Sequence, residues 1–264
     1  MENVGLFCVH GFMEDGTTSF MYLVKYLHAN GINNVYTTNL QGHNPEDDFS
    51  SFNYKKCLKQ VETEYKEYKK HYEKVFLVGF SMGGVIASHL ASKFGADKLV
   101  MISPAFKYGR GSQVVKDIAK LIQNPEISFR DLLRKDRENR WKAVREFIEL
   151  EFAERGTSYE NFVDRLSRAS ISSFINFARL VGTIKRRVKI KDIPVRLYLA
   201  ERDELVPISS GLYIFNKLDT ENKRVVILGN VHHRILASSH KYDVSEEIYH
   251  FLYSDIMARK TLIT

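Results

Sequence analysis

Cysteine is scarce in this chain, and its scarcity excludes two classes of protein. Only two cysteines occur among 264 residues, Cys8 in an apolar run and Cys57 in a charged segment. The pair is too sparse for the disulfide framework of a small secreted domain, and it lacks the spacing of metal ligands. We therefore predict that both residues are free thiols.

Long apolar runs are also missing. No window approaches 18 uninterrupted apolar residues, and the first segment, MENVGLFCVHGF, has no basic stretch before a long apolar core. These absences predict neither a membrane-spanning helix nor a secretory leader, so we expect a cytoplasmic protein. Hydrophobic residues at 44% and charged residues at 27% are typical of a single soluble globular domain.

The formal charge of +7 could indicate an acidic partner, so the place of the basic residues along the chain matters. Residues 105–191 hold 20 Lys and Arg against 11 Asp and Glu, so the excess belongs to one segment. No recognition motif or set of interleaved aromatic residues favours nucleic acid. We expect no nucleic-acid partner and no stable membrane insertion, but weak contact with acidic surfaces through this segment.

Short apolar runs alternate with amphipathic stretches along the chain. This alternation predicts an α/β fold, a doubly wound and mostly parallel sheet of about six strands. The predicted strands are Val4–Val9, Asn34–Thr38, Val75–Val78, Leu99–Ile102, Val195–Leu199 and Val225–Leu228. The predicted helices between them are Thr18–Ala29, Tyr54–His71, Met82–Phe94, Ser209–Leu218 and Lys241–Tyr253.

One long interval interrupts this rhythm. Between Ile102 and Val195 only helical patterns occur, at 112–123, 129–154, 159–169 and 172–183. We predict that residues 105–191 form a helical cap inserted into a core made of residues 1–104 and 192–264. Apolar faces on these helices predict that the cap covers the site, and the basic run 185–191 is interpreted as a solvated linker.

The segment VFLVGFSMGG, residues 75–84, contains the strongest candidate for chemistry. Ser81 lies between Gly79 and Gly83, directly after a predicted strand and before a predicted helix. Glycines leave room for a sharp turn that exposes the serine, and a helix N-terminus attracts developing negative charge. Ser81 is therefore the candidate nucleophile.

Four motifs follow one another in a fixed order. His10-Gly11-Phe12 comes after the first strand, then the serine turn, then an acidic segment after the next-to-last strand and a histidine segment after the last. In this order the chain resembles serine hydrolases of the α/β-hydrolase fold, in particular small bacterial carboxylesterases and monoacylglycerol-lipase-like enzymes with a helical cap. The resemblance covers nearly the whole chain and places the cap after the sixth strand of that fold.

The resemblance implies a Ser/His/Asp triad, and two local choices must be made. In the acidic segment, Glu201, Asp203 and Glu204 are candidates. The family pattern, an Asp three residues before a Val that begins the next helix, selects Asp203. In the histidine segment the family pattern selects His233, with its neighbour His232 as the alternative. The remaining histidines are not spaced as a metal site.

The resemblance also implies the chemistry. It implies a two-step acyl transfer that needs no cofactor, with the oxyanion held by the backbone N–H groups of Phe12 and Met82. Gly11, Gly79 and Gly83 support the two turns, and His10 braces the early loop. The expected substrates are short- to medium-chain or monoacylglycerol-like esters. Thioesterase, lactonase or carbon-carbon bond hydrolase activity are alternatives, as is a non-catalytic binding protein.

Overall fold

The computed structural model of the protein describes residues 3–44, 47, 49–108, 171–203 and 205–261. Six parallel strands form one sheet in the order β2-β1-β3-β4-β6-β8. The strands are β1 (Val4–Val9), β2 (Val35–Thr37), β3 (Lys74–Phe80), β4 (Lys98–Ile102), β6 (Val195–Ala200) and β8 (Lys223–Leu228). The α/β fold class predicted from the sequence is confirmed.

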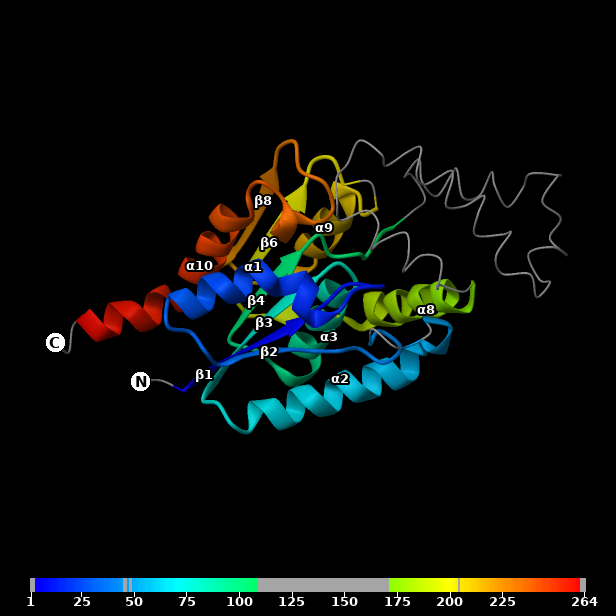
Figure 1. Ribbon diagram of the computed structural model, residues 1–264, viewed down its shortest axis with the longest axis horizontal. Helices are drawn as coiled ribbons and strands as arrows, with labels where there is room; N and C mark the ends of the chain where they lie inside the picture. Colours follow the sequence, from blue (N-terminus) through cyan, green and yellow to red (C-terminus); the bar gives the residue numbers. More distant parts are fainter. Residues whose placement is uncertain (1–2, 45–46, 48, 109–170, 204, 262–264) are drawn as a thin grey trace, which may run out of the picture.

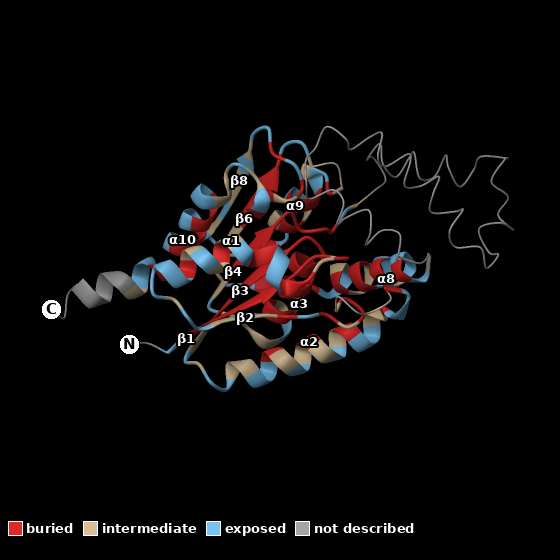
Figure 2. Ribbon diagram, viewed as in Figure 1, coloured by how far each residue is buried: buried red, intermediate tan, exposed pale blue. Residues whose placement is uncertain are grey.

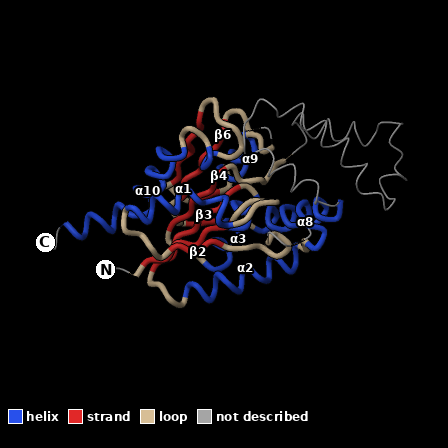
Figure 3. Tube along the Cα trace, viewed as in Figure 1, coloured by secondary structure: helices blue, strands red, loops and turns tan. Residues whose placement is uncertain are grey.

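Helices cover both faces of this sheet (Figures 1 and 3). One face carries α1 (Gly16–Ala29) and α10 (Lys241–Thr261), which pack against each other. The other face carries α2 (Tyr54–Lys69), α3 (Met82–Phe94), α8 (Ile171–Arg187) and α9 (Ile208–Phe215). Two short 3₁₀ helices, η1 (Phe49–Ser51) and η2 (Ile235–Ala237), lie in the loops. None of the described helices is long and apolar enough to cross a membrane.

The central strands are apolar on both faces because both faces are covered (Figure 2). In β3, Val75 and Leu77 face the layer of α2, α3 and α8, whereas Phe76 and Val78 face the layer of α1 and α10. All four side chains are at most 1% exposed. Burial of each such side chain contributes about 1.5–3 kcal/mol to folding, so the middle of the sheet is a firm platform for the loops at its edge.

The loop after β1 is closed by the start of α1. Asp15 is the N-cap of this helix, and its carboxylate accepts hydrogen bonds from the backbone N–H of Thr18 (2.7 Å) and from the Thr18 hydroxyl (2.8 Å). An N-cap of this kind contributes about 1 kcal/mol. The cap fixes where the helix begins and therefore limits the loop to residues 10–15.

The structure differs from the sequence-based expectation in the basic run 185–191. Helix α8 continues to Arg187, and Ile190–Lys191 forms a short strand, β5, that pairs with β7 (Leu218–Asp219). Val188 and Ile190 are buried, so the interpretation of this run as a solvated linker was wrong. A two-residue strand is too short to produce a period in the sequence.

Some of the other expectations are confirmed, and the rest concern residues outside the described part of the chain. Cys8 and Cys57 are free, as predicted, and both are buried. The predicted helix 172–183 falls within α8, which packs against α2 and α3. The predicted cap helices 112–123, 129–154 and 159–169 lie outside the described residues.

Candidate active site

Ser81 occupies a strained turn between β3 and α3. Its backbone has φ 54° and ψ −117°, a conformation that residues with a side chain rarely adopt. The surrounding backbone holds it there: Ser81 N–H donates to Ile102 O (2.9 Å), and Ser81 O accepts from Gly84 N–H (3.0 Å) and Ala105 N–H (3.1 Å). The turn therefore presents the hydroxyl at the carboxyl edge of the sheet, at the start of a helix.

The glycines around Ser81 are there because backbone lies against them. A Cβ on Gly79 would overlap Gly83 O, and a Cβ on Gly83 would overlap the backbone oxygens of Val9 and His10. Helix α3 can therefore cross the end of β1 only because position 83 has no side chain.

The structure brings Ser81, His233 and Asp203 together from three separate loops. The Ser81 Oγ atom lies 3.0 Å from His233 Nε2, and His233 Nδ1 lies 2.7 Å from Asp203 Oδ2. Because a carboxylate can only accept, His233 donates through Nδ1–H, which leaves Nε2 to accept from the serine hydroxyl. The His233 and Asp203 side chains are only 7% and 2% exposed, so water competes little for these bonds.

The environment of Asp203 keeps its carboxyl group ionised. Burial alone raises the pKa of Asp203, but the positive field of His233, its hydrogen bond and the backbone N–H of Val206 outweigh burial and lower the pKa below its usual value. Oδ1 accepts from the backbone N–H groups of Leu205 (3.0 Å) and Val206 (2.7 Å). An ionised, fully bonded carboxylate can orient the imidazole and stabilise its charged form.

The other candidates for acid and base lie elsewhere. Glu201 is exposed, and its carboxylate accepts from the Asn230 backbone N–H (2.8 Å). Glu204 lies outside the described residues. His232 is exposed, whereas its neighbour His233 is buried. Of the two histidines, His233 is the one in contact with Ser81.

The loop after β1 runs beside the serine turn. A Cβ on Gly11 would lie 3.2 Å from Ser81 Cβ, so the loop backbone approaches the nucleophile as closely as a glycine permits. No acceptor among the described residues takes a hydrogen bond from the backbone N–H of Phe12 or of Met82.

His10 ties this loop to its neighbour. Its ring is fully buried; Nε2 accepts from the Leu40 backbone N–H (3.0 Å), and Nδ1 donates to Gly11 O (2.7 Å). Both ring nitrogens are thus engaged in a neutral imidazole. His10 thus connects the loop after β1 to the segment around Leu40, which fits a bracing role rather than proton transfer.

Backbone strain is concentrated at this edge of the sheet. Five described residues other than glycine have positive φ, and four of them lie in the loops that meet at the site: Met13, Ser81, Ser103 and Asn230. The fifth, Asp192, lies between β5 and β6. Strained residues persist where the surrounding structure fixes them, and they are common at active sites.

Aromatic side chains gather around Phe12, in the loop that runs beside the serine turn. The Phe12 ring stacks on Phe177 of α8 (centroids 5.1 Å apart) and contacts Phe174 and Phe52 (5.6 Å each) and His43 (5.5 Å). Helix α8 is thereby connected to the loop that carries Phe12. The described part of the site is apolar on this side.

The sequence analysis missed a second charged contact near the histidine. Arg234 Nε lies 3.1 Å from Glu14 Oε1, which joins the histidine loop to the loop after β1. Arg234 stands where related hydrolases have an aliphatic residue, and that departure was the only signal in the sequence. The distance between positions 14 and 234 along the chain hides such a pair from pattern reading.

Comparison with known families assigns the chain. The model of the serine aminopeptidase (S33) family matches residues 4–239, most of the chain. The chain belongs to the serine aminopeptidase family. Membership in this family makes the protein an α/β hydrolase and confirms the resemblance seen in the sequence. No curated protein sequence matches the chain significantly.

Solved structures share the fold of this family member at low sequence identity. An esterase from Exiguobacterium antarcticum has a TM-score of 0.67 at 16% identity and covers 95% of this chain and 92% of its own. A Paleococcus ferrophilus monoacylglycerol lipase has a TM-score of 0.60 at 20% identity, covering 96% of each chain. A 2-hydroxy-6-oxo-6-phenylhexa-2,4-dienoate hydrolase from Rhodococcus has 0.63 at 16%, covering 95% and 90%. These likenesses establish the fold alone.

Proposed function

We propose that the protein is a serine hydrolase that cleaves carboxylic esters through an acyl-enzyme intermediate. Ser81 is the nucleophile, His233 the general base and Asp203 the residue that orients the base. The observation that carries the proposal is the continuous chain of hydrogen bonds from Ser81 Oγ through His233 to Asp203 Oδ2, at 3.0 and 2.7 Å. Without a base in reach, a serine hydroxyl is a weak nucleophile at neutral pH.

The first half of the reaction forms the acyl-enzyme. His233 Nε2 accepts the proton of Ser81 Oγ as this oxygen attacks the ester carbonyl carbon, and the carbonyl oxygen becomes an oxyanion. When the tetrahedral intermediate collapses, the bond to the alcohol oxygen breaks and His233 returns the proton to the leaving alcohol. Asp203 stays ionised throughout and stabilises the imidazolium.

The second half repeats the same steps with water. His233 takes a proton from water as the water oxygen attacks the acyl carbon, and the proton returns to Ser81 Oγ when the carboxylic acid leaves. In both halves the backbone N–H groups of Phe12 and Met82 stabilise the oxyanion. Each donor of this kind contributes about 10²–10³-fold to kcat.

The substrate class follows from the aromatic side of the site. Phe12 follows Gly11, which lies close to Ser81, and the Phe12 ring packs with those of Phe174 and Phe177, so an acyl chain bound at Ser81 would meet an apolar wall on this side. We therefore assign short- to medium-chain acyl esters or monoacylglycerol-like esters as substrates. In this proposal residues 105–191 form the cap over the core of residues 1–104 and 192–264, with α8 connecting the two.

The test uses p-nitrophenyl esters of increasing acyl length, with thioesters, lactones and a vinylogous 1,5-diketone as comparison substrates. We expect the highest kcat/KM with acetate to octanoate esters, and we expect Ser81→Ala to reduce turnover to background while the protein stays folded. Faster turnover of the diketone would assign carbon-carbon bond hydrolysis instead. A folded wild-type protein that hydrolyses none of these and is not labelled by a fluorophosphonate would contradict the proposal.

A further inference from the structure

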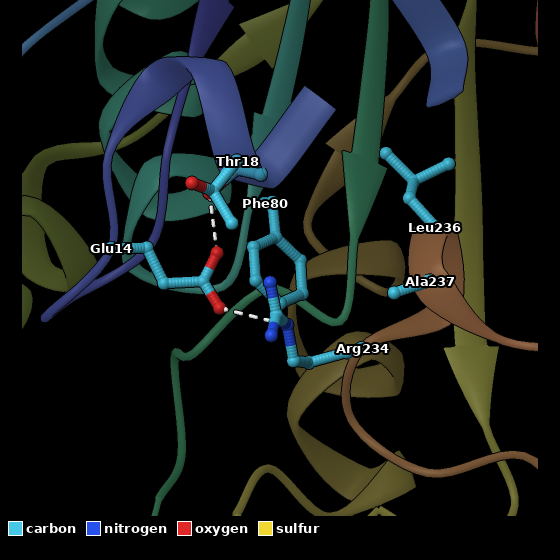
Figure 4. Close-up of a pocket in the computed structure, with 7 residues that line it drawn as sticks. Glu14, Thr18, Phe80, Arg234, Leu236 and Ala237 are labelled. Atoms are coloured by element: carbon cyan, nitrogen blue, oxygen red, sulfur yellow. Dashed lines mark hydrogen bonds and ion pairs between the residues drawn. The ribbon is translucent and has the colours of Figure 1, made fainter. Parts of the chain in front are cut away.

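Three segments of the proposed site meet at a small pocket next to the histidine (Figure 4). Glu14 comes from the loop after β1, Phe80 from the end of β3 and Arg234 from the loop after β8. The full lining consists of Glu14, Thr18, Ser19, Phe80, Arg234, Leu236 and Ala237. Each of the first three segments also carries a residue of the proposed chemistry, one or two positions away.

An ion pair crosses this pocket. Arg234 Nε donates to Glu14 Oε1 at 3.1 Å, and the other carboxylate oxygen, Oε2, accepts from the hydroxyl of Ser19 on α1. The side chains are only 28% and 16% exposed, respectively. A pair at this depth is less screened than a surface salt bridge, and removal of one partner leaves a partly buried charge without its counterion.

Both partners lie beside groups of the proposed mechanism. Arg234 directly follows His233, whereas Glu14 is two residues after Phe12, with the strained Met13 (φ 59°) between them. The Phe80 ring, which directly precedes Ser81, lies 5.0 Å from the His233 ring and also lines the pocket. The pair therefore links the loop that carries His233 to the loop after β1, and the turn that holds Ser81 lies between these two loops.

The histidine loop follows a strand at the edge of the sheet. Within the described residues β8 pairs with β6 on one side, and the loop after it is held by its buried side chains Val231, Ile235 and Leu236 and by contacts with neighbouring loops. The Asp203 hydrogen bond fixes the tilt of the imidazole at Nδ1, but Asp203 belongs to the same edge of the sheet. Among the described contacts of the histidine loop, the Glu14–Arg234 ion pair connects it to the loop after β1.

We infer that Glu14 and Arg234 are positioning residues: they hold His233 and the loop after β1, which carries Phe12, in their places on either side of Ser81. This inference rests on the proposed function. Neither residue touches the reacting atoms: Arg234 acts through His233 and Glu14 through the backbone of Phe12. Small displacements of such groups cost rate rather than binding, because the transition state requires both at once.

The experiment compares Glu14→Gln, Arg234→Met and the double variant with wild type in p-nitrophenyl butyrate hydrolysis. Each single change should lower kcat about 10- to 100-fold with KM changed less than about twofold. The double variant should be no slower than the slower single variant, because the two residues act as one unit. Arg234→Lys keeps a cation and should recover part of the loss.

Lys93→Met is the matched control. It breaks a different ion pair, one between two helices, Lys93 Nζ to Glu62 Oε2 at 2.7 Å, about 18 Å from Ser81 along α3. Thermal unfolding of all variants shows which changes act through stability. If Arg234→Met and Glu14→Gln keep kcat within about twofold of wild type, or lose no more than Lys93→Met, the inference is wrong.

A second measurement separates this inference from the proposed function. The proton that His233 Nδ1 donates to Asp203 is followed by NMR without any substrate. In Arg234→Met we expect this proton to exchange faster with water than in wild type, and in Lys93→Met we expect no change. Unchanged exchange in Arg234→Met overturns the positioning role even if ester hydrolysis is found; absent ester hydrolysis contradicts the proposed function even if exchange changes as expected.

Discussion

The strand that leads to Ser81, the proposed nucleophile, and the strand that leads to His233, the proposed base, differ in how they are held. β3 lies between β1 and β4, and every residue from Val75 to Phe80 is buried. β8 is an edge strand of half-buried residues, and Ile227 on it is 51% exposed (Figure 2). A buried strand thus carries Ser81 directly, whereas His233 is held by its own loop, which is anchored through the buried Val231, Ile235 and Leu236, and by the neighbouring loop.

Those contacts join the base to the acid. The backbone N–H of Arg202, next to Asp203, donates to Val231 O (2.9 Å), and Asn230 N–H donates to the Glu201 carboxylate (2.8 Å). The loops after β6 and β8 therefore form one unit that holds acid and base together. The site forms only when this pair of loops packs against the turn that holds Ser81. Each variant below changes one of these two parts.

The largest effect should come from removing the base. His233→Ala removes the imidazole 3.0 Å from Ser81 Oγ, so we expect kcat to fall about 10⁶-fold. His232→Ala is the matched control, because the exposed neighbour should be dispensable and kcat should stay within about threefold. Steady-state ester hydrolysis measures both. The assignment fails if His232→Ala proves the more damaging of the two.

Asp203→Asn should have the next largest effect. The amide keeps the shape of the side chain but loses the charge, and its NH₂ group can impose the wrong tautomer on His233. We expect kcat to fall about 10⁴-fold with little change in KM. Glu201→Gln on the same loop should leave kcat nearly unchanged. Similar losses in both variants would show that the loop, rather than the carboxylate of Asp203, is what matters.

Gly83→Ala tests the rigid side of the comparison. The added methyl group would overlap the backbone oxygens of Val9 and His10, which cannot yield, so we expect a loss of about 3 kcal/mol in the free energy of unfolding. Gly182→Ala in α8 meets no atom within 4 Å and should stabilise the protein by about 0.5–1 kcal/mol through helix propensity. Urea unfolding measures both, and equal effects would contradict the tight crossing of α3 over β1.

The smallest effect concerns acid stability. The pKa of Asp203 is lower in the folded protein than its ordinary value, so the unfolded chain binds the proton first as pH falls. The stability that ionised Asp203 contributes is full above its unfolded pKa of about 3.9 and is lost as pH falls through the lower folded pKa. Asp203→Asn should therefore show a weaker loss of unfolding free energy between pH 6 and pH 3 than wild type. Parallel profiles would contradict this.

The sequence predicted the sheet well because its four inner strands, β1, β3, β4 and β6, are buried on both faces. Each of the six predicted strands overlaps an observed one, since continuous apolar runs bounded by polar turns leave few alternatives. β5 and β7 were missed because two residues carry no period. Helix α9 ends at Phe215 rather than Leu218 because Leu218 belongs to β7 and pairs with Ile190 of β5, a tertiary contact that the local pattern does not reveal.

The residues of the candidate site also differ in how far the sequence predicts them. Ser81 stands out in the sequence because the sharp turn that holds it requires glycines at a fixed spacing. The choice between His232 and His233 needed a family pattern, since both have the same chemistry and only the direction of the chain decides which one faces the serine. The Glu14–Arg234 pair was beyond reach, because it depends on how two distant loops pack.

The most direct test of the central claim is to locate a covalent adduct. The protein is treated with a fluorophosphonate, digested, and its peptides are mapped by mass spectrometry, with Ser81→Ala and His233→Ala treated in parallel. The account predicts a single adduct on Ser81 in wild type, none in Ser81→Ala, and labelling slowed by orders of magnitude in His233→Ala. An adduct on another serine, or equal labelling of His233→Ala and wild type, would contradict it.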